Sequence, residues 1–231
     1  MNAMRVVGAT LAALLMVATG APSAHADDGP SWTSIYEGTA YEGSGWSDCP
    51  APITVSVDAR ALKKDQRKKA KAALVAAVKR WNRAKIVRFE YVGPLPVTFD
   101  RGTGVSTPID GQARDRHIYV AVVDAKKRKD ADAGVVGLAT PLRVDPATNV
   151  ILEGSAAFLA KYVNKQTRLK VAELFAHELG HVFGLGHSTS KKDVMHAILQ
   201  GRRDLGPGDV AGALALLEPC PAPIPASTPT G

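Results

Sequence analysis

The chain has 231 residues, of which 45% are hydrophobic and 22% are charged, and its formal net charge at pH 7 is +7. This composition is ordinary for a folded globular protein, and it excludes a disordered chain, a collagen and a coiled coil. No run of about 18 apolar residues follows the N-terminal region, so no membrane span is expected. The length is enough for one domain with a sizeable core, or at most two small ones.

The N-terminus has the pattern of a secretory signal. Arg5 supplies a positive charge, residues 6–18 form an apolar stretch too short to cross a bilayer, and the Ala-His-Ala of residues 24–26 is typical of a cleavage site. We therefore expect residues 1–26 to be removed and the protein to be secreted into the extracellular space. Loss of that one arginine leaves 28 basic and 22 acidic residues, a net charge of +6.

Cys49 and Cys220 are the only two cysteines. Cysteines in an exported protein most often pair, so we expect a disulfide between them. A bridge that closes so long a loop contributes about 4–5 kcal/mol in the chain-entropy model. The competing interpretation is that one thiolate is a removable ligand that silences a metal site.

The first half of the chain predicts strands around one long helix. Residues 27–48 show no clear period, and they are a short leader, an ordered arm or a pro-segment. The alternation of residues 53–57 predicts a strand. Apolar side chains recur at three and four positions across residues 62–85, which predicts a helix with one buried face and a lysine-rich outer face. Three more strands are predicted, at residues 86–91, 97–99 and 117–123, followed by a basic loop at 126–129.

The second half begins with extended segments and continues into a helix. Small residues at 134–140 predict an extended segment that Pro141 ends. Residues 150–159 are compatible with a strand or a short helix. Thr167 is placed to cap a helix over residues 169–183.

The chain ends with one more helix and a tail. The predicted helix covers residues 209–217, with Asp209 or Gly208 as its cap, and residues 221–231 are a tail rich in Pro, Ser and Thr. Strands early and helices late are typical of an α+β domain.

The residues that carry chemistry concentrate in residues 177–187, HELGHVFGLGH. His177 and His181 are four apart on a predicted helix, so both imidazoles project from one face. Two glycines before His187 allow a turn that brings this third imidazole back beneath the first two. Three neutral imidazoles leave the fourth position of a tetrahedral zinc ion open, which marks a catalytic site rather than a structural one.

Glu178 follows His177 directly and therefore points about 100° around the helix from it. We expect Glu178 not to bind the metal but to act as the general base, taking a proton from the attacking water and delivering it to the leaving amine. This arrangement suits peptide-bond hydrolysis. The alternative is three core histidines that bind nothing.

The same segment resembles the long zinc-binding signature of the metzincin metalloproteases. The Asp-Val-Met of residues 193–195 resembles their Met-turn, in which Met195 forms the hydrophobic floor beneath the ligands. Ser188 after the third histidine, and Ala197 two residues after the methionine, resemble the matrixin branch rather than the astacins. The resemblance covers roughly residues 49–217.

The resemblance implies a metzincin fold: a twisted, mixed and mostly parallel five-stranded sheet with two long helices, then a small irregular C-terminal subdomain with one helix. The catalytic domain would span residues 49–220, with zinc on the floor of the cleft between the two parts. Gly137, Leu138 and Ala139 resemble the edge strand that pairs with the substrate backbone.

Glu173 lies four residues before His177 and shares its helix face. In matrixins the matching position lines the pocket for the side chain just after the cleaved bond, so we predict that Glu173 biases this pocket toward a basic or polar residue. The alternative is an acid in the first helical turn, favoured there by the helix dipole.

Two features of vertebrate matrixins are not found. The chain carries no cysteine-switch motif, so latency through Cys49 is not expected. The segment between Val123 and Ser155 lacks the pattern for a second, structural zinc and for calcium. We therefore expect one catalytic Zn²⁺, whereas Ca²⁺ has no support in the sequence.

The sequence predicts a secreted zinc metalloendopeptidase acting on proteins or peptides, monomeric by default. No nucleic-acid partner is expected, because the basic residues lack interleaved aromatics and a binding motif. Three alternatives stay open: a zinc-holding binding module without turnover, a basic exported protein that binds acidic polymers, and a zinc hydrolase acting on a non-protein amide. The intact Glu178 argues against the first.

Overall fold

The computed structural model describes residues 31–39, 42–127 and 135–220, so the expected signal, the tail and part of the basic loop lie outside the described residues. The strands are β1 (Ile53–Asp58), β2 (Phe89–Pro94), β3 (Val97–Phe99), β4 (Ser106–Pro108), β5 (His117–Val123), β6 (Gly137–Val144) and β7 (Ile151–Leu159). The helices are α1 (Lys64–Arg83), α2 (Ala160–Lys165), α3 (Arg168–Phe183) and α4 (Pro207–Ala215), with a short 3-10 turn η1 (Ala125–Lys127).

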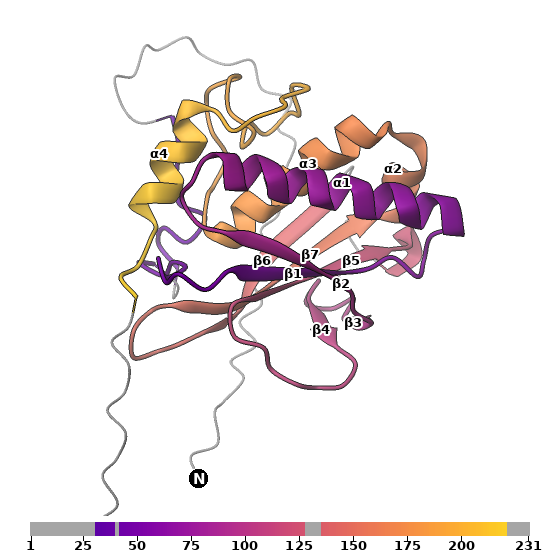
Figure 1. Cartoon of the computed structure of the whole chain (residues 1–231), viewed down its shortest axis with the longest axis horizontal. Helices are drawn as coiled ribbons and strands as arrows, with labels where there is room; N and C mark the ends of the chain where they lie inside the picture. Colours follow the sequence, from indigo (N-terminus) through magenta and orange to yellow (C-terminus); the bar gives the residue numbers. More distant parts are fainter. Residues whose placement is uncertain (1–30, 40–41, 128–134, 221–231) are drawn as a thin grey trace, which may run out of the picture.

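Five strands form one sheet in the order β2-β1-β5-β7-β6. The first four of these run parallel, and β6 is antiparallel to β7 at the edge. The two long helices α1 and α3 lie on one face of the sheet, and the β3–β4 hairpin lies on the other (Figure 1). The predicted α+β class and the mixed five-stranded sheet are confirmed.

The core forms where α1 and α3 pack on the sheet. Buried residues recur along α1 every three to four positions, from Ala70 to Trp81, as the sequence predicts. All seven residues of β5 are buried, which is typical of a central parallel strand covered on both faces. The indole Nε1 of Trp81 donates to Ala176 O at 3.0 Å, which ties α1 to the helix that carries the histidines.

Two strands differ from their predicted bounds. β2 begins at Phe89 rather than at residue 86, because the chain first reverses after α1 through Lys85, whose φ of 57° is left-handed. β6 continues through Pro141 to Val144, with irregular register after the proline. An edge strand tolerates a proline because one of its sides needs no ladder partner.

Three short elements differ from the predictions or were not predicted. β4 and α2 are too short to leave a periodic pattern. α4 begins at Pro207 with Gly206 as its cap, so the prediction of Asp209 or Gly208 as cap is wrong. The Asp209 carboxylate still reaches back to accept from Gly206 N at 2.7 Å.

Residues 151–159 are a strand, which decides between the two interpretations of that segment.

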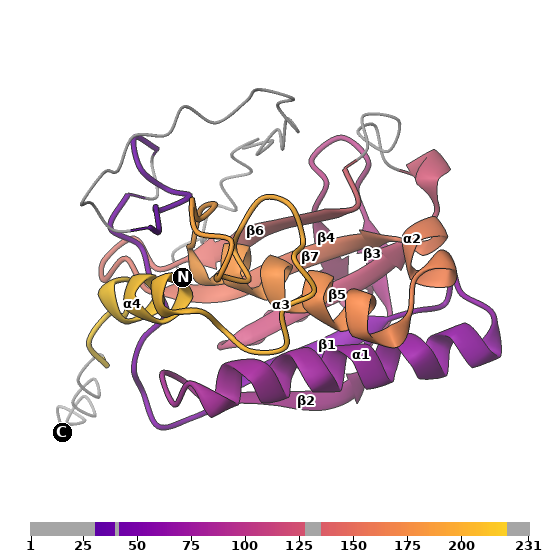
Figure 2. The same ribbon diagram turned by 90° about the horizontal axis from the view of Figure 1, so that it is seen from above.

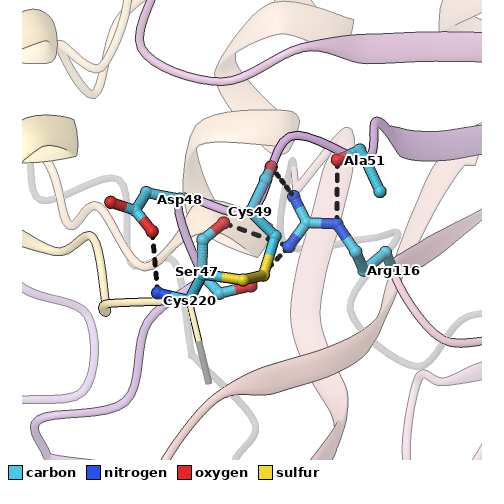
Figure 3. The surroundings of a disulfide bond; sticks show 6 residues. All are labelled: Ser47, Asp48, Cys49, Ala51, Arg116 and Cys220. Carbon is cyan, nitrogen blue, oxygen red and sulfur yellow. Dashed lines mark hydrogen bonds between the residues drawn. A yellow bond between two sulfur atoms is a disulfide. The ribbon is translucent and has the colours of Figure 1, made fainter. Parts of the chain in front are cut away.

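The two ends of the domain meet at a disulfide between Cys49 and Cys220, whose Cα atoms lie 4.8 Å apart (Figure 3). Beside it, Asp48 Oδ1 accepts from Cys220 N at 2.7 Å. Arg116 donates from Nη1 to Ser47 O at 3.0 Å, which joins this corner to the start of β5. Both sulfur atoms are committed to the bond, so neither is a thiolate ligand.

None of the helices that the structure describes is both long and apolar enough to cross a bilayer.

Candidate active site

Helix α3 and the turn that follows it bring the three histidines together. Thr167 caps the helix as predicted, its hydroxyl accepting from Lys170 N at 3.4 Å. Gly184 ends the helix in a left-handed conformation, with φ of 113°, which side-chain-bearing residues rarely adopt. The chain reverses there, and His187 comes back toward the helix.

The imidazoles of His177, His181 and His187 converge. One ring nitrogen from each lies within 4.8 Å of the others. The ring centroids are 4.6 Å apart for His177 and His181, 5.4 Å for His177 and His187, and 5.0 Å for His181 and His187. His177 and His181 are buried, whereas His187 is partly exposed.

Backbone carbonyls fix which nitrogen of each helical histidine is free. His177 Nδ1 donates to Val194 O at 2.8 Å, and His181 Nδ1 donates to Leu185 O at 2.7 Å. Because a carbonyl only accepts, these nitrogens carry the protons, and each Nε2 presents a lone pair. In the described part of the chain, Nε2 of His181 and of His187 is buried without a hydrogen-bond partner. Buried polar atoms are rarely left unsatisfied, and a zinc ion among them would supply the missing partner, so these residues fit zinc.

The protonation states of the three histidines are also suited to metal binding. Burial lowers the pKa of His177 to about 4 and holds the pKa of His181 well below its usual value. Burial likewise lowers the pKa of His187. All three rings are therefore neutral at pH 7, which is the form that binds a metal.

Glu178 lies beside this cluster and is only 2% exposed. Its carboxylate packs against the backbone of Gly137 at the start of β6, where a Cβ on the glycine would collide with Oε1. Leu138 and Ala139 follow in the same edge strand and pair on their inner side with Ala157 and Ala156 of β7. The structure thus brings Glu178 and the predicted substrate strand together.

Met195 is buried next to the same helix. Its sulfur occupies the space that a side chain at Gly180 would fill. The carboxylate of Asp209 in α4 accepts from Val194 N at 2.7 Å and from Met195 N at 3.0 Å. Helix α4 therefore holds the turn whose Val194 carbonyl orients His177.

Residues 46–216 match the family model of the matrixins. This chain belongs to the matrixin family. The match confirms the resemblance that was inferred from the zinc signature, and it covers the greater part of this chain.

Two further comparisons, with curated proteins and with solved structures, find no match or only a distant one. No curated protein matches this chain. Among solved structures it is similar to metalloproteinase-II from Bacteroides fragilis, at 15% sequence identity and a TM-score of 0.46. The similarity covers 74% of this chain and 55% of that one, so the matrixin spans little more than half the length of that protein.

Glu173 is 2% exposed and lies in the second turn of α3. The alternative of a first-turn acid favoured by the helix dipole is therefore wrong. Glu173 Oε1 accepts from Arg202 N at 2.7 Å, which ties it to the loop between Met195 and α4. The buried guanidinium of Arg80 is close enough for the Glu173 charge to raise its pKa, against a larger lowering by burial.

Sequence reasoning missed the residues that brace the site. Asp193 was noted only as part of the Met-turn, and Asp209 only as a helix cap. Asp193 is 1% exposed and accepts from Ser188 Oγ at 2.5 Å and from Gly208 N at 3.0 Å. The glycines at 206 and 208 were the available signal, because a side chain at either would collide with Asp193.

Proposed function

We propose that this matrixin is a secreted zinc endopeptidase in which His177, His181 and His187 hold one catalytic zinc ion and Glu178 is the general base. The observation that carries the proposal is the convergence of three neutral imidazoles, each with one ring nitrogen within 4.8 Å of the others. Membership of the matrixin family supports the same function.

When bound, zinc supplies Lewis-acid activation of water and of the scissile carbonyl. The protein positions the reaction around it. The carbonyls of Val194 and Leu185 hold the two helical imidazoles in their orientation. Glu178 takes the proton of the attacking water and returns it to the leaving amine, so its carboxylate must keep a fixed position beside the histidines. Gly137 provides the space for that carboxylate.

An extended peptide is the substrate that the edge strand favours. β6 is the last strand of the sheet, and its start lies next to Glu178. A peptide that adds to Gly137, Leu138 and Ala139 as a further strand would place its backbone beside the general base. Glu173 would bias the pocket after the cleaved bond toward a basic or polar side chain, although the nearby Arg80 offsets part of its charge.

Export supports this proposal. Residues 1–26 have the pattern of a secretory signal, and the Cys49–Cys220 disulfide belongs in an oxidising compartment. We propose that the enzyme acts outside the cell as a monomer.

Cleavage of a mixed peptide library, with products read by mass spectrometry, tests the function. Wild type and Glu178→Ala are compared at equal zinc content, with and without a zinc chelator. We expect wild-type cuts that the chelator abolishes and that Glu178→Ala makes at least about 100-fold more slowly, because a general base contributes about that much. Wild-type protein that holds zinc but makes no cuts, or a Glu178→Ala variant with full activity, would contradict the proposal.

A further inference from the structure

The first described residues of the chain run along the turn that carries the third histidine. We call residues 31–36 the N-terminal arm. Three backbone hydrogen bonds join it to the turn, at alternate arm residues: Ile35 N to Gly184 O (2.9 Å), Gly186 N to Thr33 O (2.8 Å) and Thr189 N to Ser31 O (2.9 Å). Ser34 and Leu185 form the antiparallel bridge between them. The arm therefore adds a short strand to the turn, and it lies beside α4 (Figure 2).

The glycines of this region make room for the arm. A side chain at Gly186 would collide with the hydroxyl of Thr33. A Cβ at Gly212 in α4 would come within 2.7 Å of the Trp32 ring. The arm thus packs where two glycines leave space for it.

The contacts of the arm lead directly to two of the three histidines. Thr33 Oγ1 donates to the carbonyl oxygen of His187 at 3.2 Å. Leu185, the bridge partner of the arm, is fully buried and supplies the carbonyl that accepts from His181 Nδ1. Holding this turn in place therefore fixes the position of His187 and the orientation of His181 together.

A side-chain bond at the end of the arm braces the same turn. Ser31 Oγ donates to Asp193 Oδ2 at 3.0 Å. The same oxygen accepts from Ser188 Oγ, next to His187 in sequence, and Ser188 N donates to Met195 O at 2.9 Å. The arm, the turn and the segment around Met195 thus share one buried carboxylate.

We propose that the N-terminal arm is a positioning element of the zinc site, which the site needs in order to hold its metal tightly. This inference rests on the proposed zinc function. Of the three interpretations of residues 27–48, it favours an ordered arm over a leader or a pro-segment. Groups that orient metal ligands typically contribute about 10- to 100-fold in metal affinity or activity.

Zinc affinity of the full chain tests the proposal, measured by competition with a chromogenic chelator. Three variants are compared with wild type: removal of residues 27–36, Thr33→Val, which keeps the shape but removes the hydroxyl, and Thr33→Ser, which restores it. Thr107→Val, an exposed residue of β4 far from the turn in sequence, is the matched control. The unfolding midpoint of each metal-free protein and its kcat and KM on a peptide are measured alongside.

We expect the zinc dissociation constant to rise about 10- to 100-fold on removal of residues 27–36 and about 10-fold in Thr33→Val, with kcat falling more than KM changes. Thr33→Ser and Thr107→Val should match wild type. A folded deletion variant with unchanged zinc affinity, or with higher activity, would overturn the proposal. If the deletion variant does not fold, unchanged zinc affinity in Thr33→Val would overturn it instead.

Zinc affinity also separates this proposal from the proposed function. Wild-type protein that binds zinc but cleaves no peptide would contradict the endopeptidase, and the affinities of the variants would still decide the role of the arm.

Discussion

At the scale of single residues, His117 shows how burial sets a protonation state away from the active site. Thr54 Oγ1 donates to Arg116 O at 3.1 Å and therefore accepts from His117 Nδ1 at 2.7 Å. The other ring nitrogen, Nε2, then accepts from Ser56 Oγ at 2.8 Å. These bonds fit the neutral ring, which is 3% exposed. Burial, assisted by the nearby Arg114, lowers the pKa of His117 to about 4.

A pH-dependent stability follows from this pKa. The unfolded ring titrates near pH 6.5, so the unfolded state binds more protons than the native state between about pH 6.5 and 4. The stabilisation is fully present above this window and is lost as the pH falls through it. We expect the free energy of unfolding of wild type to fall by about 2 kcal/mol more than that of His117→Gln between pH 7 and 4.5. Urea unfolding across that range measures the difference, and parallel pH profiles would contradict it.

At the scale of elements, the meeting of β6 and α3 gives a prediction about catalysis. Gly137→Ala places a methyl group where the Glu178 carboxylate lies, so the carboxylate must move. A displacement of about 1 Å at a catalytic group can cost about 100-fold in rate. We expect kcat/KM to fall by at least about 10-fold while zinc affinity stays at the wild-type value.

Gly102→Ala is the control for that variant, because Gly102 lies in the turn between β3 and β4 and meets only Asp100 Oδ1, at 3.1 Å. It should keep full activity. Full activity in Gly137→Ala as well would show that the position of Glu178 is not restricted by β6.

The elements also show how far sequence patterns reach. α1, β5 and α3 were predicted because a long run of residues repeats one burial pattern. The start of β2, the extension of β6 past Pro141 and the true cap of α4 were not, because each depends on the conformation or contact of a single residue rather than on a repeated pattern. Lys85 in a left-handed conformation and Gly206 against Asp193 leave no periodic signal.

At the scale of the whole molecule, sequence patterns predict the ligand residues of the site but not the residues that hold them in place. The convergence of the three histidines could be predicted, because four-residue spacing puts His177 and His181 on one helix face and two glycines allow the turn that returns His187. The arm that braces His187 lies about 150 residues earlier in the chain, as the 154-residue separation of Thr33 and His187 shows. No local pattern encodes a contact over that distance.

The disulfide also connects distant parts of the chain. It joins residues 171 positions apart and closes the domain beside the start of β5. In the chain-entropy model a loop of that length contributes about 5 kcal/mol by restricting the unfolded chain. The turn after α3 and helix α4 lie inside this closed loop, whereas the arm precedes it in the chain.

Anomalous diffraction from crystals of the zinc-loaded chain, recorded on both sides of the zinc absorption edge, would show whether the three histidines hold the metal. We expect one peak at about 2.0–2.1 Å from Nε2 of His177, His181 and His187, with the Glu178 carboxylate outside the coordination shell. A crystal with no peak among the three rings, or with a peak that Glu178 itself coordinates, would contradict this expectation.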